Sequence, residues 1–267
     1  MKAAGLSYSA AQVRAQDLDR FHLALCAPAT VQEAWLALAA FNLELARTAS
    51  RVTDANLGRI RLQWWREVLE ELAGQGPVRA HQVALALAEC RPRLNLKVLH
   101  EMVDARERDL RLDEQPWADA ADLSAYLAQT QGALLTAQAQ ALGLGGSEDP
   151  GETEDLARHL GCAHGFVVQA RALAGGKASA QHMPQAWLDD PEQGLASATD
   201  AAAKHLAQAQ ALRQQRRDDA KALETLFKIG VLTARWLRVF ENTKDPLGKA
   251  KFLRPLPFQA LRLSFGF

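Results

Sequence analysis

Apolar side chains recur three or four positions apart along most of the chain, which is the spacing of one face of an α-helix. Residues 28–47 show it first, and Pro28 suits a helix start, because backbone N–H groups in the first turn have no helical partner. The same spacing predicts further helices, over residues 54–72, 77–87, 94–112, 122–142, 152–173, 195–217 and 221–240. No segment alternates apolar and polar residues as a strand would, so we expect an all-α fold.

Within the predicted helix 152–173, Gly161 and Gly165 stand four positions apart and share one helix face. A face without side chains lets a neighbouring helix approach closely. We interpret the pair as a packing feature. His159 and His164 are five apart on the same helix and therefore point to different faces, so the sequence predicts no histidine metal site there.

The composition fits one globular domain: 267 residues, 48% hydrophobic and 23% charged. Its 31 basic and 31 acidic residues cancel, so no overall field attracts DNA or RNA, and we exclude a nucleic-acid partner. The three cysteines (Cys26, Cys90 and Cys162) lie far apart, which favours reduced thiols in a reducing compartment.

No stretch approaches the roughly 20 apolar residues of a membrane span, and the N-terminus lacks the apolar core of a signal peptide. We therefore expect a protein of the cytoplasm or the mitochondrial matrix, either soluble or peripheral to the inner membrane. A transit peptide stays open, because Lys2 and Arg14 are basic and the first sixteen residues contain no acid.

The C-terminal end differs in character from the rest. We expect residues 1–243 to form the helical domain and residues 244–267 a basic, aromatic tail, with five basic residues and one acid. Such a tail suits a membrane surface or a partner's groove, or it packs on its own domain, and the sequence leaves these alternatives open.

Three stretches resemble one family. They are "LCAPATVQEAWLALAAFNLELARTAS" (25–50), "LGRIRLQWWREVLEEL" (57–72) and "LGCAHGFVVQARALAGG" (160–176), the last followed by "MP". Their order and spacing resemble squalene and phytoene synthases over roughly residues 17–190. The resemblance implies the isoprenoid synthase fold, a single-domain helical bundle around a central cavity.

The resemblance also implies a chemistry, in which Mg²⁺ held by two aspartate-rich motifs neutralises the diphosphate leaving groups of prenyl substrates. Here Ala46 and Ser50 stand where the paired aspartates of the first motif belong. Ala172, Gly175 and Gly176 stand at the acidic positions of the second, although Arg171 is kept. We therefore predict no catalytic residue, no metal ligand and no cofactor.

The stretches "AFNLELA", "LGRIRLQWWRE" and "DARERDL" resemble the branch of this family that contains a mitochondrial complex I assembly factor. That resemblance implies a non-catalytic role in NADH dehydrogenase assembly, with complex I subunits or assembly proteins as partners. Two alternatives stay open. One is a prenyl diphosphate transferase that holds Mg²⁺ through atypical ligands such as Glu44 and Asp104. The other is a carrier of an isoprenoid or lipid ligand in the inherited cavity.

Eight residues are candidates to line that cavity: Asn42, Glu44, Arg47, Arg61, Trp64, Trp65, Asp104 and Arg171. Arginines without neighbouring acids would favour an anion. The alternative is that the arginines pair with glutamates on the surface, and that Asp104 pairs with Arg108 one helical turn away. Trp64 and Trp65 point about 100° apart on a helix, so we expect one of them in the core.

Overall fold

The computed structural model describes residues 6–74, 76–111, 116–145, 150–179, 182–216, 220–257 and 259–265. These residues form helices and contain no strand, which confirms the expected all-α fold. The helices are α1 (Tyr8–Gln16), α2 (Leu18–Leu25), α3 (Ala29–Ala46), α4 (Ala55–Ala73), α5 (Gln82–Glu89), α6 (Leu96–Ala105), α7 (Ala120–Leu127), α8 (Ala133–Ala141), α9 (Pro150–Ala174), α10 (Gln185–Asp189), α11 (Pro191–Gln215), α12 (Ala220–Glu241) and α13 (Gln259–Phe265). Short turns of helix lie at η1 (Ala49–Arg51), η2 (Arg91–Arg93), η3 (Arg108–Leu110), η4 (Ala128–Gly132) and η5 (Ala250–Leu253).

Several of the predicted helices differ from the observed ones. The third helix begins at Gln82 instead of Pro77, because His81 has extended backbone angles. The predicted helix 94–112 stops at Ala105, where the chain tightens into the η3 turn. The predicted helix 122–142 is interrupted by η4, a π-helical turn. Helices α1, α2, α10 and α13 were not predicted.

Side-chain caps explain where several helices begin. Ser7 Oγ accepts a hydrogen bond from Ala10 N–H at 3.1 Å at the start of α1. Asp17 separates α1 from α2, and its carboxylate accepts from Arg20 N–H at 3.0 Å. Asn95 and Asp119 cap α6 and α7 in the same way. The caps fix the turn between α1 and α2, which borders the candidate site.

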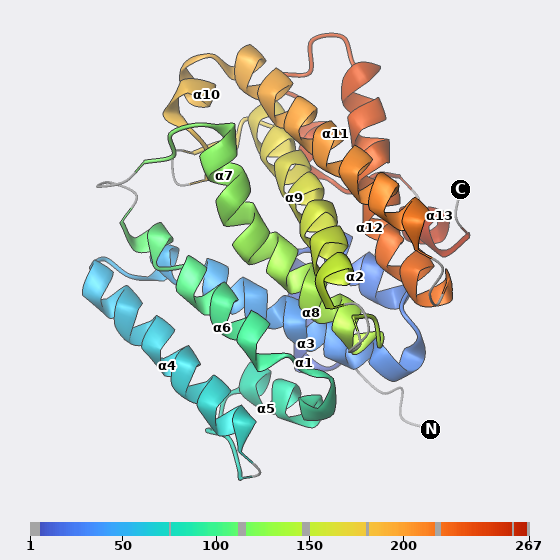
Figure 1. Ribbon diagram of the computed structural model, residues 1–267. Helices are drawn as coiled ribbons and strands as arrows, with labels where there is room; N and C mark the ends of the chain where they lie inside the picture. The colour runs from blue at the N-terminus through green and yellow to red at the C-terminus, as the bar shows by residue number, and fades with distance from the viewer. Residues whose placement is uncertain are drawn as a thin grey trace.

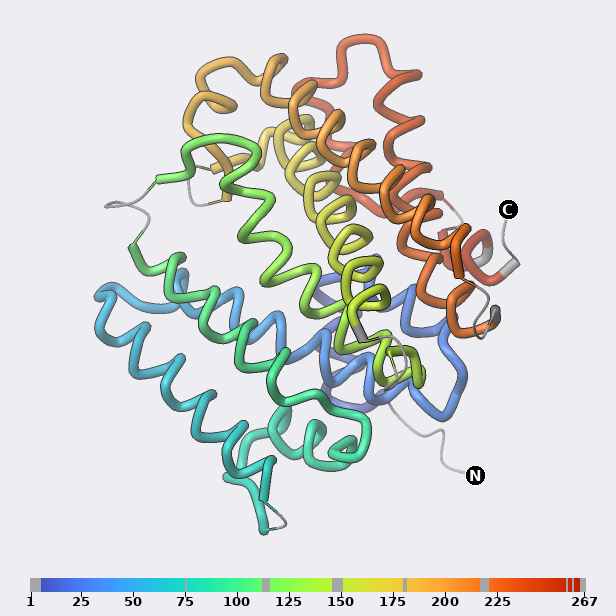
Figure 2. Tube along the Cα trace, in the orientation of Figure 1, coloured from blue at the N-terminus to red at the C-terminus, as the bar shows by residue number. Residues whose placement is uncertain are grey.

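Helices α3 and α9 form the centre of the bundle (Figure 1). Helix α3 is buried along most of its length and packs against α1, α2, α5 and α8. Helix α9 crosses the molecule diagonally and contacts α8, α11 and α12. In Figure 2 the early helix α2 lies beside the final helix α13, so both ends of the described chain meet on one side.

Large side chains fill the space between α3 and α8. Trp35 Nε1 donates to the backbone oxygen of Gln138 at 3.0 Å, and Gln138 Nε2 donates back to the Trp35 oxygen at 3.3 Å. Beside them, Arg20, Leu135 and Ile229 border a void of about 10 Å³. That volume holds about one water molecule and cannot hold a prenyl chain.

The C-terminal tail packs on the helices in its described part. Phe252 and Leu263 are buried. The N–H of Lys249 donates to the Ala174 oxygen at 2.9 Å, and Lys228 Nζ donates to the Leu263 oxygen at 2.7 Å. Phe258 and Phe267 and the side chains of Leu261 and Phe265 lie outside the described residues. A membrane role of the tail stays a prediction. No described helix is both long and apolar enough to cross a bilayer.

The expected close approach at Gly161 is present. A methyl group built on Gly161 would lie 2.5 Å from the backbone of Gln131 and Gly132. Here α9 and η4 touch backbone to backbone, so neither side can move away cheaply. At Gly165 the nearest neighbour is only the flexible side-chain end of Leu127.

We expect Gly161→Ala to lower the free energy of unfolding by about 2 kcal/mol, because overpacking against backbone forces the helices apart. Gly151→Ala is the matched control, since nothing lies within 4 Å of a methyl group there, and its effect should stay within about 0.5 kcal/mol. Urea denaturation measures both. Equal stability of the two variants would contradict the close crossing.

Candidate functional site

The region of the first motif, at the end of α3, forms a small surface pocket. Its volume is about 200 Å³, and its lining consists of Glu44, Thr48, Arg61, Trp64, Trp65 and His81. Four of the eight candidate residues therefore meet in one place. Trp65 is buried and packs edge-on against Phe41 at 5.1 Å between ring centroids, whereas Trp64 is half-buried. The pocket is smaller than typical ligand sites of about 300 Å³ and above.

Glu44, the carboxylate of this pocket, is already engaged. Gln12 Nε2 of α1 donates to Glu44 Oε1 at 2.5 Å, and Arg51 Nη1 donates to Oε2 at 3.0 Å. Arg47 lies 3.7 Å from Oε1. This last contact is the surface pairing that the sequence offered as the alternative for Arg47. A carboxylate bound to a guanidinium is already neutralised and is a poor ligand for a second cation.

Asn42 belongs to a different, buried network. Its Oδ1 accepts from Arg106 Nη2 at 3.1 Å. Arg106 also donates to the Tyr126 hydroxyl at 2.5 Å, and that hydroxyl donates to Asp109 at 2.6 Å. Burial raises the pKa of Tyr126, so the phenol stays protonated. The network joins α3, α7 and the turn after α6.

Asp104 lies apart from both motif regions. Its side chain is 61% exposed and accepts from Arg66 Nε at 2.8 Å, an arginine that also contacts Glu107. The predicted pair of Asp104 with Arg108 is wrong. Because α6 ends before Arg108, this arginine turns away and pairs with Asp122. Asp104 and Glu44 therefore belong to separate ion-pair groups.

The region of the second motif lies on α9 around Arg171. The guanidinium forms an ion pair with buried Asp19 of α2, and Nε donates to the Phe252 oxygen at 2.9 Å. It also lies over the Trp236 ring, 4.2 Å from the centroid. A methyl group built on Gly175 would lie 2.5 Å from the side chain of Leu253. The chain's own C-terminal segment thus occupies space next to the second motif.

Asp19 stands at the centre of a buried charge network that was not predicted. Gln259 Nε2 of α13 donates to Asp19 Oδ1 at 2.8 Å. Burial alone would raise the pKa of Asp19, but the neighbouring Arg171 charge holds it below its usual value. Arg20 also lies in the interior, where it pairs with Asp17 and donates to Gln131.

The buried side chain of His164 on α9 lies beside this network. Complete burial, reinforced by the nearby Arg20 charge, lowers the pKa of His164 to about 3. The histidine is therefore neutral at physiological pH. An open hollow of about 450 Å³ borders the group and is lined in part by Arg14, Asp17 and Val168.

The residues at the motif positions do not fit magnesium. Mg²⁺ prefers carboxylate oxygens, and Ala46, Ser50, Ala172 and Gly175 offer none. The acids nearest these regions, Glu44 and Asp19, are bound to arginines. Within the described residues no three His, Cys, Asp or Glu side chains are grouped to hold a metal ion. The prediction that the protein uses no cofactor stays a prediction.

The bundle and its two motif regions define the class of protein. The sequence model of the family "Squalene/phytoene synthase" matches residues 13–238, so the chain belongs to the squalene/phytoene synthase family. Among solved structures, a dehydrosqualene synthase in complex with ligand superposes with a TM-score of 0.70 at 14% identity, over 97% of this chain and 93% of that one. This likeness confirms the isoprenoid synthase fold.

Curated proteins of one name are similar to part of this chain. "NADH dehydrogenase (ubiquinone) complex I, assembly factor 6" of Rattus norvegicus is 32% identical over 163 residues, which are 60% of this chain and 46% of the relative. The protein of the same name from Homo sapiens is 31% identical over the same shares. The match thus spans about half the length of these relatives.

We expect stability to fall in mild acid because of His164. Its folded pKa of about 3 lies below the unfolded value of about 6.5, so only the unfolded chain takes up a proton between these values. The contribution of neutral, buried His164 to the free energy of unfolding is complete above pH 6.5 and is lost as the pH falls toward 3. Lowering the pH from 7.5 to 5.0 should cost roughly 2 kcal/mol through this one group.

His164→Gln removes the titrating group. The free energy of unfolding of this variant should therefore fall by roughly 2 kcal/mol less than that of the intact chain between pH 7.5 and 5.0. Urea titrations of both proteins across pH 5.0–7.5 measure the two slopes. Circular dichroism at pH 7.5 checks that the variant is folded. Identical slopes would show that His164 is protonated equally in both states and would refute the burial argument.

Proposed function

We propose that the protein is a non-catalytic member of its family that acts in the assembly of NADH dehydrogenase, complex I. The observation that carries the proposal is that alanine, serine and glycine replace the acids at both motif positions, while the chain's own groups bind the charges left nearby. Arg171 is held by Asp19 and by the Phe252 carbonyl, and Glu44 by Gln12 and Arg51. The names of the curated relatives support the assembly role.

An assembly protein works through its surfaces, so its partners would be complex I subunits or other assembly proteins. We infer a location next to the inner mitochondrial membrane, or next to the corresponding bacterial membrane, because complex I is built there. Membrane contact through the C-terminal tail belongs to the same proposal. The buried Phe252 and Leu263 are not available for it unless the tail detaches.

The transferase alternative requires Glu44 and Asp104 to act together on one metal ion. Their arginine partners differ, and Asp104 points to solvent with 61% of its side chain exposed. The carrier alternative places an apolar chain inside the bundle, where the void between Trp35, Leu135 and Ile229 has a volume of about 10 Å³. The separate ion pairs of Glu44 and Asp104 do not favour the transferase over the assembly role, and the small void does not favour the carrier.

A gene deletion in the source organism tests the proposal. We expect less assembled NADH dehydrogenase on native gels and lower NADH oxidation by membranes, with succinate dehydrogenase unchanged as the control. The intact chain should restore assembly, and so should the double variant Glu44→Gln, Asp104→Asn. Unchanged NADH dehydrogenase in the deletion strain would refute the assembly role. Rescue by the intact chain but not by an equally abundant double variant would favour the transferase instead.

A further inference from the structure

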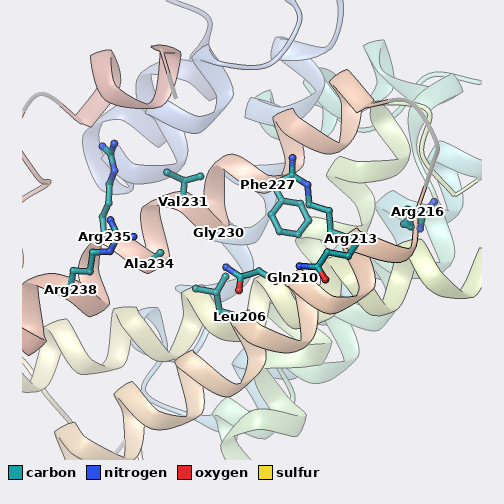
Figure 3. Close-up of a pocket in the computed structure, with 11 residues that line it drawn as sticks. Leu206, Gln210, Arg213, Arg216, Phe227, Gly230, Val231, Ala234, Arg235 and Arg238 are labelled. Carbon is teal, nitrogen blue, oxygen red and sulfur yellow. The ribbon is translucent and has the colours of Figure 1, made fainter. Parts of the chain in front are cut away.

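An open groove lies between the antiparallel helices α11 and α12, away from both motif regions. Its volume is about 740 Å³, within the range of small-molecule sites. Figure 3 shows α11 contributing Leu206, Gln210 and Arg213, and α12 contributing Val231 and Arg235. The two helices come from one hairpin, so the groove is formed by neighbouring segments of the chain.

The charged residues in the described lining of this groove have one sign. Four lining residues are arginines, namely Arg213, Arg216, Arg235 and Arg238, and none is Asp or Glu. The loop 217–219, which joins the two helices, lies outside the described residues.

Two of the four arginines, Arg235 and Arg238, lie together at the end of the groove away from the loop (Figure 3). Arg235 and Arg238 are three positions apart on α12, so they share a helix face. Partial burial, together with Arg262 of α13 and Arg238, lowers the pKa of Arg235. Like charges this close repel each other, and a bound anion would remove that repulsion.

The floor between the two ends of the groove is apolar. Val231 is 36% exposed on it, and Phe227 lies deeper, with the Arg213 guanidinium 4.4 Å above its ring. Gly230 is buried against Leu160 and Leu206, so the two helices approach closely at the bottom of the groove (Figure 3). An apolar floor next to a cluster of guanidinium groups suits a ligand with one charged end and one apolar end.

We propose that the α11–α12 groove binds a phosphate group that carries an apolar chain, with the phosphate at Arg235 and Arg238 and the chain along Val231 and Phe227. Guanidinium groups bind phosphate oxygens in pairs, with a geometry that lysine cannot match. The phosphate could belong to a phospholipid headgroup or to a soluble phosphate amphiphile. The proposal rests on this groove alone and does not depend on the assembly role.

Calorimetric titration of the full chain tests the site with dihexanoyl phosphatidic acid, a short-chain phosphate amphiphile used below its micelle concentration. We expect saturable binding at one site. Dihexanoyl phosphatidylcholine has the same chains, but its phosphate is esterified to choline. Inorganic phosphate has no chain. Both should bind at least tenfold more weakly. Equal binding of the phosphatidylcholine would refute the arginine contacts, and equal binding of inorganic phosphate would refute the apolar floor.

Variants distinguish this groove from general electrostatic attraction. Arg235→Gln with Arg238→Gln should weaken binding of the phosphatidic acid at least about tenfold, since two charge-assisted contacts are lost. Arg93→Gln with Lys97→Gln is the matched control, because both residues are exposed and the net charge changes equally. The affinity of this control variant for the phosphatidic acid should stay within twofold of the affinity of the intact chain. Equal losses in the two double variants, or no binding by the intact chain, would overturn the proposal.

Vesicle sedimentation separates the two sources of phosphate. If the ligand is a membrane headgroup, the chain sediments with phosphatidylcholine vesicles that contain phosphatidylglycerol and does not sediment with vesicles of pure phosphatidylcholine. The double variant Arg235→Gln, Arg238→Gln then no longer sediments with the phosphatidylglycerol vesicles. If short-chain phosphatidic acid binds but neither kind of vesicle does, the ligand is a soluble phosphate amphiphile.

Discussion

The buried ion pair between Asp19 and Arg171 holds together three distant parts of the chain. Asp19 lies on α2 near the N-terminus, Arg171 on the long central helix α9, and Gln259 of α13, near the C-terminus, donates to the same carboxylate. The Arg171 guanidinium also holds the Phe252 carbonyl of the tail. Removal of one member of a buried pair typically costs about 3–5 kcal/mol, because the other charge is left without a partner. The packing of both chain ends therefore depends on this contact.

The same contact engages the arginine of the second motif region. Arg171 is the residue of that motif that the chain retains, and its donors already have protein acceptors. Opposite charges that are satisfied inside the protein have little to gain from an external ligand. At the first motif, Glu44 is satisfied by Gln12 and Arg51 in the same manner. Both regions have become structural contacts between α1, α2, α3 and α9.

Much of the fold could be predicted from the sequence, because long helices with a regular apolar face depend on local spacing alone. The positions of α3, α4, α9, α11 and α12 followed from that spacing. The family resemblance identified the missing acids, since they are a property of the sequence. Four candidates, including Trp64 and Trp65, meet in one pocket, although their role in binding stays a prediction.

The buried networks could not be predicted, because their partners are far apart in the chain. Nothing near Asp19 indicates that it pairs with Arg171, 152 positions away. Arg106 lies in a segment where acidic and basic residues alternate, yet it is buried against Asn42. The expected pair of Asp104 with Arg108 assumed a helix that ends too early for it. In each case tertiary contacts decided the geometry.

We propose that this chain has the fold of its family without its reaction. Diphosphate release from farnesyl diphosphate and geranylgeranyl diphosphate, measured with and without Mg²⁺ on the purified full chain, tests it most directly. The account predicts no release above the protein-free rate, while an active squalene synthase in the same buffer turns over. Magnesium-dependent release that scales with the protein concentration would contradict it.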